Sequence, residues 1–273
     1  MSTTSKSFIL SNRKVNRPTP YADVYALVER IDEWYSWDVD DVALLDETLE
    51  DVIKAETIRD WSFIVGDVVN YGGSGHNTKL RSNVAIMNLN SATDCSNRNT
   101  ERCQVPDGEC YAYKGETRNE NEMGGPLSSR RRQQVVWDLL DAETFFEAYK
   151  LHYERKRNEV DFFRWSQSGD FRNRSDVIKV EYISRRLKEE CDIQAYTYSA
   201  SSHIDWAERE SFVLNQSNAD VPGDRRFSAV IDRDDIPEDG MLCAYDRTDG
   251  EVGCGDCTAC MSDNAPDVYI ELH

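Results

Sequence analysis

Lysine and histidine are scarce in this chain of 273 residues, which has 9 lysines against 23 arginines and only 4 histidines. No apolar run approaches the roughly 20 residues that a membrane-spanning helix needs. Residues 1–14 also lack the apolar stretch of a signal peptide. We therefore expect a cytoplasmic protein with no membrane partner, and we do not expect the disulfides that are typical of small secreted domains.

Negative charge dominates. The chain has 51 acidic and 32 basic residues, which gives a net charge of −19. Acid excess combined with few lysines is typical of proteins that work in high salt. There carboxylates stay hydrated, and salt screens their repulsion within about 3 Å at 1 M. We interpret the source as a halophilic archaeon or one of its viruses or plasmids. An acidic mesophilic protein is the alternative interpretation.

Apolar periodicity predicts an α/β fold. Helices are predicted over 129–140, 143–156, 175–190 and 205–210, and strands over 83–89, 160–166, 192–198, 211–216, 227–231 and 241–245. Strands separated by helical crossovers imply a parallel sheet. We predict an open or partial parallel barrel, similar to a TIM barrel, in residues 66–273. An acidic helical extension is expected over residues 1–65.

Cysteines carry the main chemical signal. Three of them, the loop cysteines, lie in a stretch rich in Asn and Gly (90–127) that follows a predicted strand: Cys95, Cys103 and Cys110. Four more, the C-terminal cysteines, lie within 243–262: Cys243, Cys254, Cys257 and Cys260. The eighth, Cys191, is expected to be a buried apolar residue.

Spacing of the cysteines indicates metal binding. The last three C-terminal cysteines follow C-x-x-C-x-x-C, a spacing that lets thiolates converge on one metal. Together with Cys243 they have the count for a four-cysteine zinc site or an iron–sulfur cluster. The loop cysteines offer three thiolates and one open coordination position, which metal catalysis requires. Alternatively, both groups contribute to structural sites.

Polar residues follow two of the predicted parallel strands, where ligands bind in sheets of this kind. In the segment after strand 160–166 we predict catalytic roles for Ser168 and Asp170 and cofactor contacts for Gly169 and Phe171. From the next strand we predict cofactor contacts by Tyr196, Thr197 and Tyr198. In the alternative, Asp170 only organises the turn before the next helix.

Several motifs occur in an order that resembles the phage gene product 88 family, found in phages, plasmids and mobile elements. They are Asn77-Thr-Lys79-Leu80, the loop cysteines ending in Cys110-Tyr-Ala112, Ser168-Gly-Asp-Phe171, Ala195-Tyr-Thr197, and Cys243 with Cys254-Gly-Asp-Cys-Thr-Ala-Cys260. The loop begins Cys95-Ser, where the family usually has Cys-Pro. The resemblance implies that the protein is encoded by a phage, plasmid or other mobile element, but it defines no reaction.

The strand followed by a three-cysteine loop that ends C-Y-A looks like the opening of a radical S-adenosylmethionine barrel. In such barrels three cysteines hold a [4Fe–4S] cluster and one iron is free for the cofactor. The spacing here departs from C-x3-C-x2-C, with seven and six intervening residues.

Two functions follow from these patterns. The first is an iron–sulfur enzyme of radical type that uses S-adenosylmethionine. The second is a zinc-stabilised module that binds nucleic acid or protein, in which Arg130, Arg131 and Arg132 grip a phosphate backbone. The sequence leaves open whether the substrate is a small molecule, a protein or a nucleic acid.

Overall fold

The computed structural model describes residues 51–52, 54–73, 79–98, 100, 102–103, 110–117, 126–156, 159–262 and 264–271. Residues 1–50 and 53 of the expected N-terminal extension, together with Asn77 of the first motif, lie outside these residues. No helix in the described ranges is long and apolar enough to cross a membrane.

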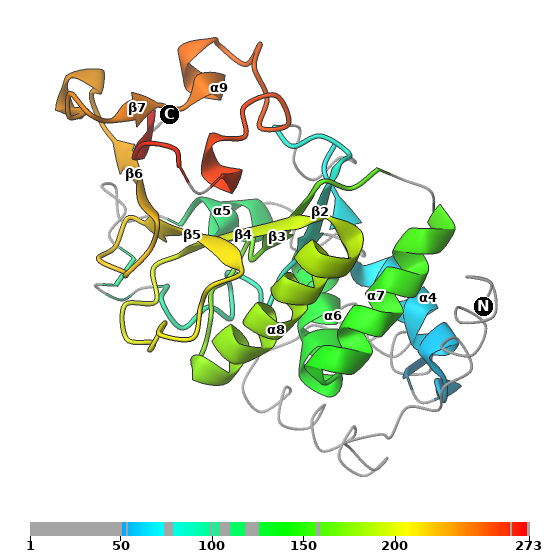
Figure 1. The fold of residues 1–273 in the computed structure, drawn as a ribbon. Coiled ribbons are helices and arrows are strands. Elements are labelled where there is room, and N and C mark those ends of the chain that lie inside the picture. The colour runs from blue at the N-terminus through cyan, green and yellow to red at the C-terminus, as the bar shows by residue number, and fades with distance from the viewer. Residues whose placement is uncertain are drawn as a thin grey trace.

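An open sheet of eight strands forms the centre of the described structure (Figure 1). The strands, in spatial order, are β1 (Asn70–Tyr71), β2 (Val84–Met87), β3 (Phe162–Trp165), β4 (Gln194–Ser199), β5 (Phe212–Ser217), β6 (Arg225–Val230), β8 (Val268–Glu271) and β7 (Met241–Leu242). β1 is antiparallel to β2, and the other neighbouring pairs are parallel. The prediction of an α/β fold with a mostly parallel sheet is confirmed, and the sheet is not closed.

Four helices cover one face of this sheet (Figure 1). They are α4 (Ile58–Val68), α6 (Pro126–Leu139), α7 (Ala142–Lys156) and α8 (Arg174–Cys191). Because β2 to β6 lie in chain order and parallel crossovers are right-handed, the connecting helices fall on the same side. The core between them and the sheet is aromatic, with the rings of Trp137, Phe145 and Trp165 between 5.5 and 6.0 Å apart.

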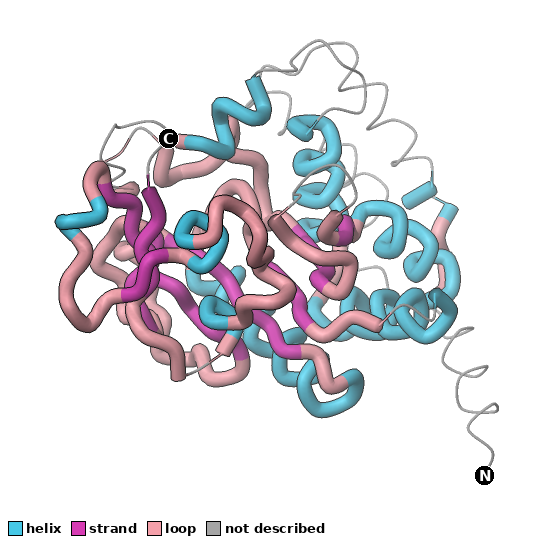
Figure 2. The backbone as a smooth tube through the Cα atoms, turned by 90° about the horizontal axis from the view of Figure 1, so that it is seen from above, coloured by secondary structure: helices cyan, strands magenta, loops and turns pink. Residues whose placement is uncertain are grey.

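The C-terminal segment 241–262 covers the opposite face, and Figure 2 shows its loops and short helices over the strands. It contains α9 (Ala244–Arg247) and the short 3-10 helix Ala259–Met261. Alternate strand residues face it and form a second apolar cluster with Met261: Val84, Ile86, Tyr196 and Val213. Asn215 Nδ2 donates to the Cys260 carbonyl at 3.0 Å, which holds the cysteine-rich segment against β5.

The structure differs from the sequence-based prediction in several elements. The helix predicted over 205–210 is wrong, because Trp206 is buried there and a tight turn bonds Arg209 N to the Trp206 carbonyl at 3.0 Å. Helix α5 (Tyr111–Thr117) lies within the stretch 90–127, for which we predicted no helix. The expected boundary between residues 65 and 66 falls inside α4, whose capping box at Thr57 and Asp60 marks its start.

Candidate functional site

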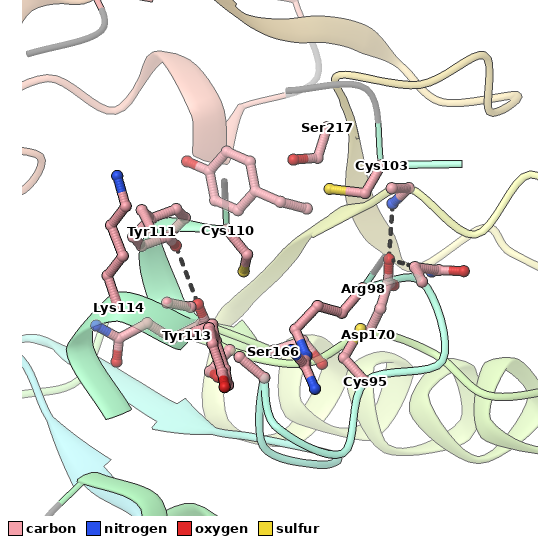
Figure 3. Close-up of a pocket in the computed structure, with 18 of the residues that line it drawn as sticks. Cys95, Arg98, Cys103, Cys110, Tyr111, Tyr113, Lys114, Ser166, Asp170 and Ser217 are labelled. Atoms are coloured by element: carbon pink, nitrogen blue, oxygen red, sulfur yellow. Dashed lines mark hydrogen bonds between the residues drawn. The ribbon is translucent and has the colours of Figure 1, made fainter. Parts of the chain in front are cut away.

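A cavity of about 360 Å³ opens at the carboxyl ends of β2, β3 and β4 (Figure 3). All three loop cysteines line it, so we name it the cysteine cavity. The loop after β2 contributes Cys95 and Arg98, the loop after β3 contributes Ser168, Gly169 and Asp170, and β4 contributes Tyr198. The topology therefore brings together the loop cysteines and part of the Ser168–Phe171 motif, which are far apart in the sequence.

Burial controls the acidity of Cys95 and Cys103. It raises the pKa of Cys95 to about 12, to which the nearby Asp170 and Cys110 add. It also raises the pKa of Cys103 to about 11, and again Cys110 and Asp170 contribute. These thiols stay protonated at neutral pH unless a cation compensates the thiolate charge. A bound metal ion does this, since a coordinating thiol is deprotonated outright.

In the part of the chain that the structure describes, no three His, Cys, Asp or Glu side chains are grouped so that they could hold a metal ion. Residues 104–109, which connect Cys103 to Cys110, are not among the described residues. The loop cysteines share one cavity. Metal binding by them stays a prediction.

Asp170 is buried, and both of its carboxylate oxygens are occupied. Oδ1 accepts hydrogen bonds from Ser199 Oγ at 2.6 Å and from Phe171 N at 2.7 Å. Oδ2 accepts from Ala200 N at 2.7 Å and from Asn97 Nδ2 at 2.9 Å. Burial raises the pKa of Asp170, and these hydrogen bonds oppose the rise. The carboxylate thus ties the loop of Cys95 to the loops after β3 and β4, a role that corresponds to the turn-organising alternative.

The backbone around Ser168 is held by two asparagines that follow β2. Asn88 Oδ1 accepts from Ser168 N at 2.7 Å, and Asn90 Oδ1 accepts from Asp170 N at 2.8 Å. Gly169 has φ of 69°, and a Cβ at this position would lie 1.7 Å from Asn90 Oδ1. Glycine is therefore required both by the left-handed backbone and by the close approach of Asn90. The sequence analysis missed both asparagines, although an Asn-x-Asn directly after a strand was a usable signal.

Glu116 on α5 is a further buried residue that the sequence analysis missed. Its carboxylate accepts from Ala92 N, Thr93 N and Ser168 Oγ, each at 2.8 Å, and from Arg130 Nη1 at 2.6 Å. The charge of Arg130 and these hydrogen bonds outweigh desolvation and lower the pKa of Glu116. Ser168 is consequently a donor in a fixed network at the cavity wall.

The three successive arginines of α6 are each paired with a carboxylate. Arg130 pairs with Glu116, and buried Arg131 contacts Asp94 through Nε at 3.0 Å. Arg132 contacts Asp67 at 2.5 Å. Their charges are compensated within the fold, which argues against a phosphate-binding role for this helix.

The four C-terminal cysteines line a second, small cavity of about 20 Å³, the C-terminal cavity. Burial raises the pKa of Cys260 to about 11; a hydrogen bond with Tyr198 lowers it and the Cys254 and Cys243 thiols raise it. The fold thus gathers the four residues that the sequence assigned to one metal site. Tyr198 lines this cavity as well as the cysteine cavity, so the two lie on either side of one side chain.

Three of the predicted cofactor contacts lie in the core and do not appear among the described lining residues of the cysteine cavity. Phe171 packs against Trp206 with ring centroids 4.9 Å apart. Thr197 Oγ1 donates to the Trp165 carbonyl at 2.9 Å. Tyr196 is fully buried beneath the C-terminal segment. Cys191, which we expected to be buried, is only partly buried and packs against the main core.

A family model described as Gene product 88 matches residues 67–260, more than two thirds of the chain. No curated protein and no solved structure matched.

Proposed function

This chain belongs to the Gene product 88 family, and we propose that it is an iron–sulfur enzyme whose cluster is held by Cys95, Cys103 and Cys110. One observation carries the proposal: the three loop cysteines line a single cavity at the carboxyl ends of parallel strands. Ligands bind at this edge in open α/β sheets. Three cysteines are one fewer than the four that usually hold a [4Fe–4S] cluster, so one iron has a position for another ligand.

The donor set fits a metal centre. Cys95 and Cys103 are partly buried, and the neighbouring Cys110 adds to the cost of ionising either one. Positive charge at this place would remove that cost. A bound cluster supplies electron transfer and, with S-adenosylmethionine, radical chemistry. The chain's own residues shape the site: Asp170 positions the loop of Cys95 through Asn97, and Glu116 fixes Ser168 at the wall.

We assign a second metal centre to Cys243, Cys254, Cys257 and Cys260. These residues share the C-terminal cavity, and Cys254 N donates to the Lys79 carbonyl at 2.8 Å. A metal there would fasten the segment that covers the second face of the sheet. Its proposed role is structural or auxiliary, because the C-terminal cavity is too small for a substrate beside a metal.

The deciding experiment is metal and acid-labile sulfide analysis, with an absorption spectrum, on protein purified without oxygen in molar salt. We expect about four irons and four sulfides per cluster and absorption near about 400 nm. Cys95→Ser should remove the iron of the loop site, and Cys254→Ser should remove the metal of the C-terminal site. Cys191→Ser is the matched control and should change neither value.

Other results would overturn these assignments. One or two zinc ions without sulfide would refute the enzyme and leave a zinc-stabilised binding module. Unchanged metal content in Cys254→Ser would refute the C-terminal centre. If iron and sulfide are found, reductive cleavage of S-adenosylmethionine by the reduced protein tests the radical chemistry, and Cys95→Ser should abolish it.

A further inference from the structure

Arg164 on β3 is a cationic side chain that lines the cysteine cavity. Its Nε atom is buried without a hydrogen-bond partner, and none of the described carboxylates forms an ion pair with it. The guanidinium lies over the ring of Tyr198, with Cζ 4.7 Å from the ring centroid. Desolvation works to lower the pKa of Arg164, and the Tyr111, Tyr196 and Tyr198 hydroxyls and the Cys254 thiol raise it, so that the net shift is upward.

The lack of a carboxylate at Arg164 contrasts with other arginines of the fold. Arg130 and Arg131 each contact a carboxylate, and Arg172 contacts two, those of Asp138 and Asp176. The chain has 51 acidic residues, so a carboxylate partner for Arg164 could readily have come from its own sequence. Arg164 is partly buried, and holding a partly buried guanidinium without an anion is unfavourable, because the charge loses part of its hydration. An anionic molecule bound in the cavity would supply a counter-charge to Arg164.

Arg98 is a second guanidinium in the wall of the same cavity. Its Nε atom is buried without a partner, Nη2 donates to the Thr93 carbonyl at 3.2 Å, and the group lies 4.1 Å from the ring centroid of Tyr113. Asp170 is the carboxylate among the described lining residues, and its oxygens already accept four hydrogen bonds from the surrounding loops. The cavity thus offers two guanidinium groups that form no ion pair with the described carboxylates.

We propose that the cysteine cavity binds an anionic ligand, a carboxylate or phosphate group of a cofactor or substrate, through Arg164 and Arg98. The planar guanidinium fork matches both groups, since it donates two parallel hydrogen bonds. The inference rests on the proposed function in one respect, that this cavity is the ligand site. It does not depend on the identity of the metal.

Titration calorimetry tests the proposal with two weakly chelating probes, inorganic phosphate and succinate, at fixed ionic strength. We expect the full-length protein to bind at least one of them at a single site. Arg164→Gln should weaken that binding at least tenfold, and Arg98→Gln should weaken it as well. Arg164→Lys, which keeps the charge without the fork, should be intermediate. Arg185→Gln is the matched control, because Arg185 is exposed on α8, and it should bind like the unaltered protein.

Thermal unfolding without added anion separates binding from folding. Arg164→Gln should leave Tm unchanged or raise it, since an uncompensated cation is removed. A fall of several degrees would assign Arg164 a structural role and overturn the proposal. Binding of neither probe, or equal binding by Arg164→Gln, would overturn it too.

Metal analysis of the same samples distinguishes failure of this proposal from failure of the proposed function. Metal-free protein that binds phosphate or succinate would refute the iron–sulfur site and support the anion site. Iron-loaded protein that binds neither phosphate nor succinate would support the iron–sulfur site and refute the anion site. Preference between the two probes identifies the anionic group as a phosphate or a carboxylate.

Discussion

Gly66 on α4 allows two helices to approach closely. A Cβ at this position would lie 1.9 Å from His152 Nδ1 on α7. We expect Gly66→Ala to lower the free energy of unfolding by about 2 kcal/mol, because the steric conflict exceeds the gain of about 1 kcal/mol from better helix propensity. Urea unfolding measures this difference.

Gly115 on α5 provides the matched control, because a Cβ there would meet nothing within 4 Å. Gly115→Ala should therefore stabilise the protein by about 0.5–1 kcal/mol. Equal effects of the two substitutions would show that the contact between Gly66 and His152 does not limit the approach of α4 to α7.

His152 makes stability depend on pH. Burial, with the nearby Lys156 and Arg155, lowers its pKa to about 4 from an ordinary value of 6.5. The unfolded chain therefore takes up a proton first as the pH falls, so the contribution is complete above about pH 6.5 and is lost towards pH 4. We expect unfolding free energy to fall between pH 7 and pH 5, and His152→Gln to remove about 1 kcal/mol of that fall after allowance for solvent screening. Urea unfolding at the two pH values measures it, and an identical fall in the variant would contradict the assignment.

At the scale of elements, Glu116 joins α5, α6 and the loops after β2 and β3 through one carboxylate. Glu116→Gln should destabilise the protein by about 3 kcal/mol, because Arg130 loses its counter-charge and the amide cannot accept from every donor. It should also lower metal occupancy at the loop cysteines. Chemical unfolding and metal analysis of the same preparation provide both values.

Two variants control the Glu116 experiment. Glu154→Gln removes an exposed carboxylate on α7 and should change stability by less than about 0.5 kcal/mol. Adding Arg130→Met to Glu116→Gln should recover part of the loss, because no charge is then left uncompensated. If the double variant is destabilised by the sum of the two single effects, the uncompensated charge of Arg130 does not explain the destabilisation by Glu116→Gln.

At the scale of the whole molecule, the net charge is −19, and the excess carboxylates repel one another. We propose that the protein is adapted to high salt and expect Tm to rise by several degrees between 0.1 M and 2 M KCl, because salt screens this repulsion. Thermal unfolding followed by circular dichroism measures the rise. Sucrose at matched osmolality is the uncharged control and should raise Tm less, and a Tm independent of KCl would contradict the proposal.

Local sequence patterns were sufficient to predict several helices and strands. α8 and strands β3 to β6 follow from apolar periodicity, because burial on one face is visible in the order of residues. The two cysteine groups follow from spacing in the same way, and each group lines one cavity. The turn around Trp206 could not be predicted, since that residue is buried by contacts with Phe171 and not by a helical pattern.

The sequence by itself determined the α/β class and the family motifs. Only the tertiary structure decided what each polar residue does. Asp170 accepts hydrogen bonds through both carboxylate oxygens, and Arg130 to Arg132 are paired internally, while Arg164 forms no ion pair with a described carboxylate. The physical reason is that hydrogen bonds and ion pairs join residues tens of positions apart. Their partners are set by the register and order of the strands, which no local pattern encodes.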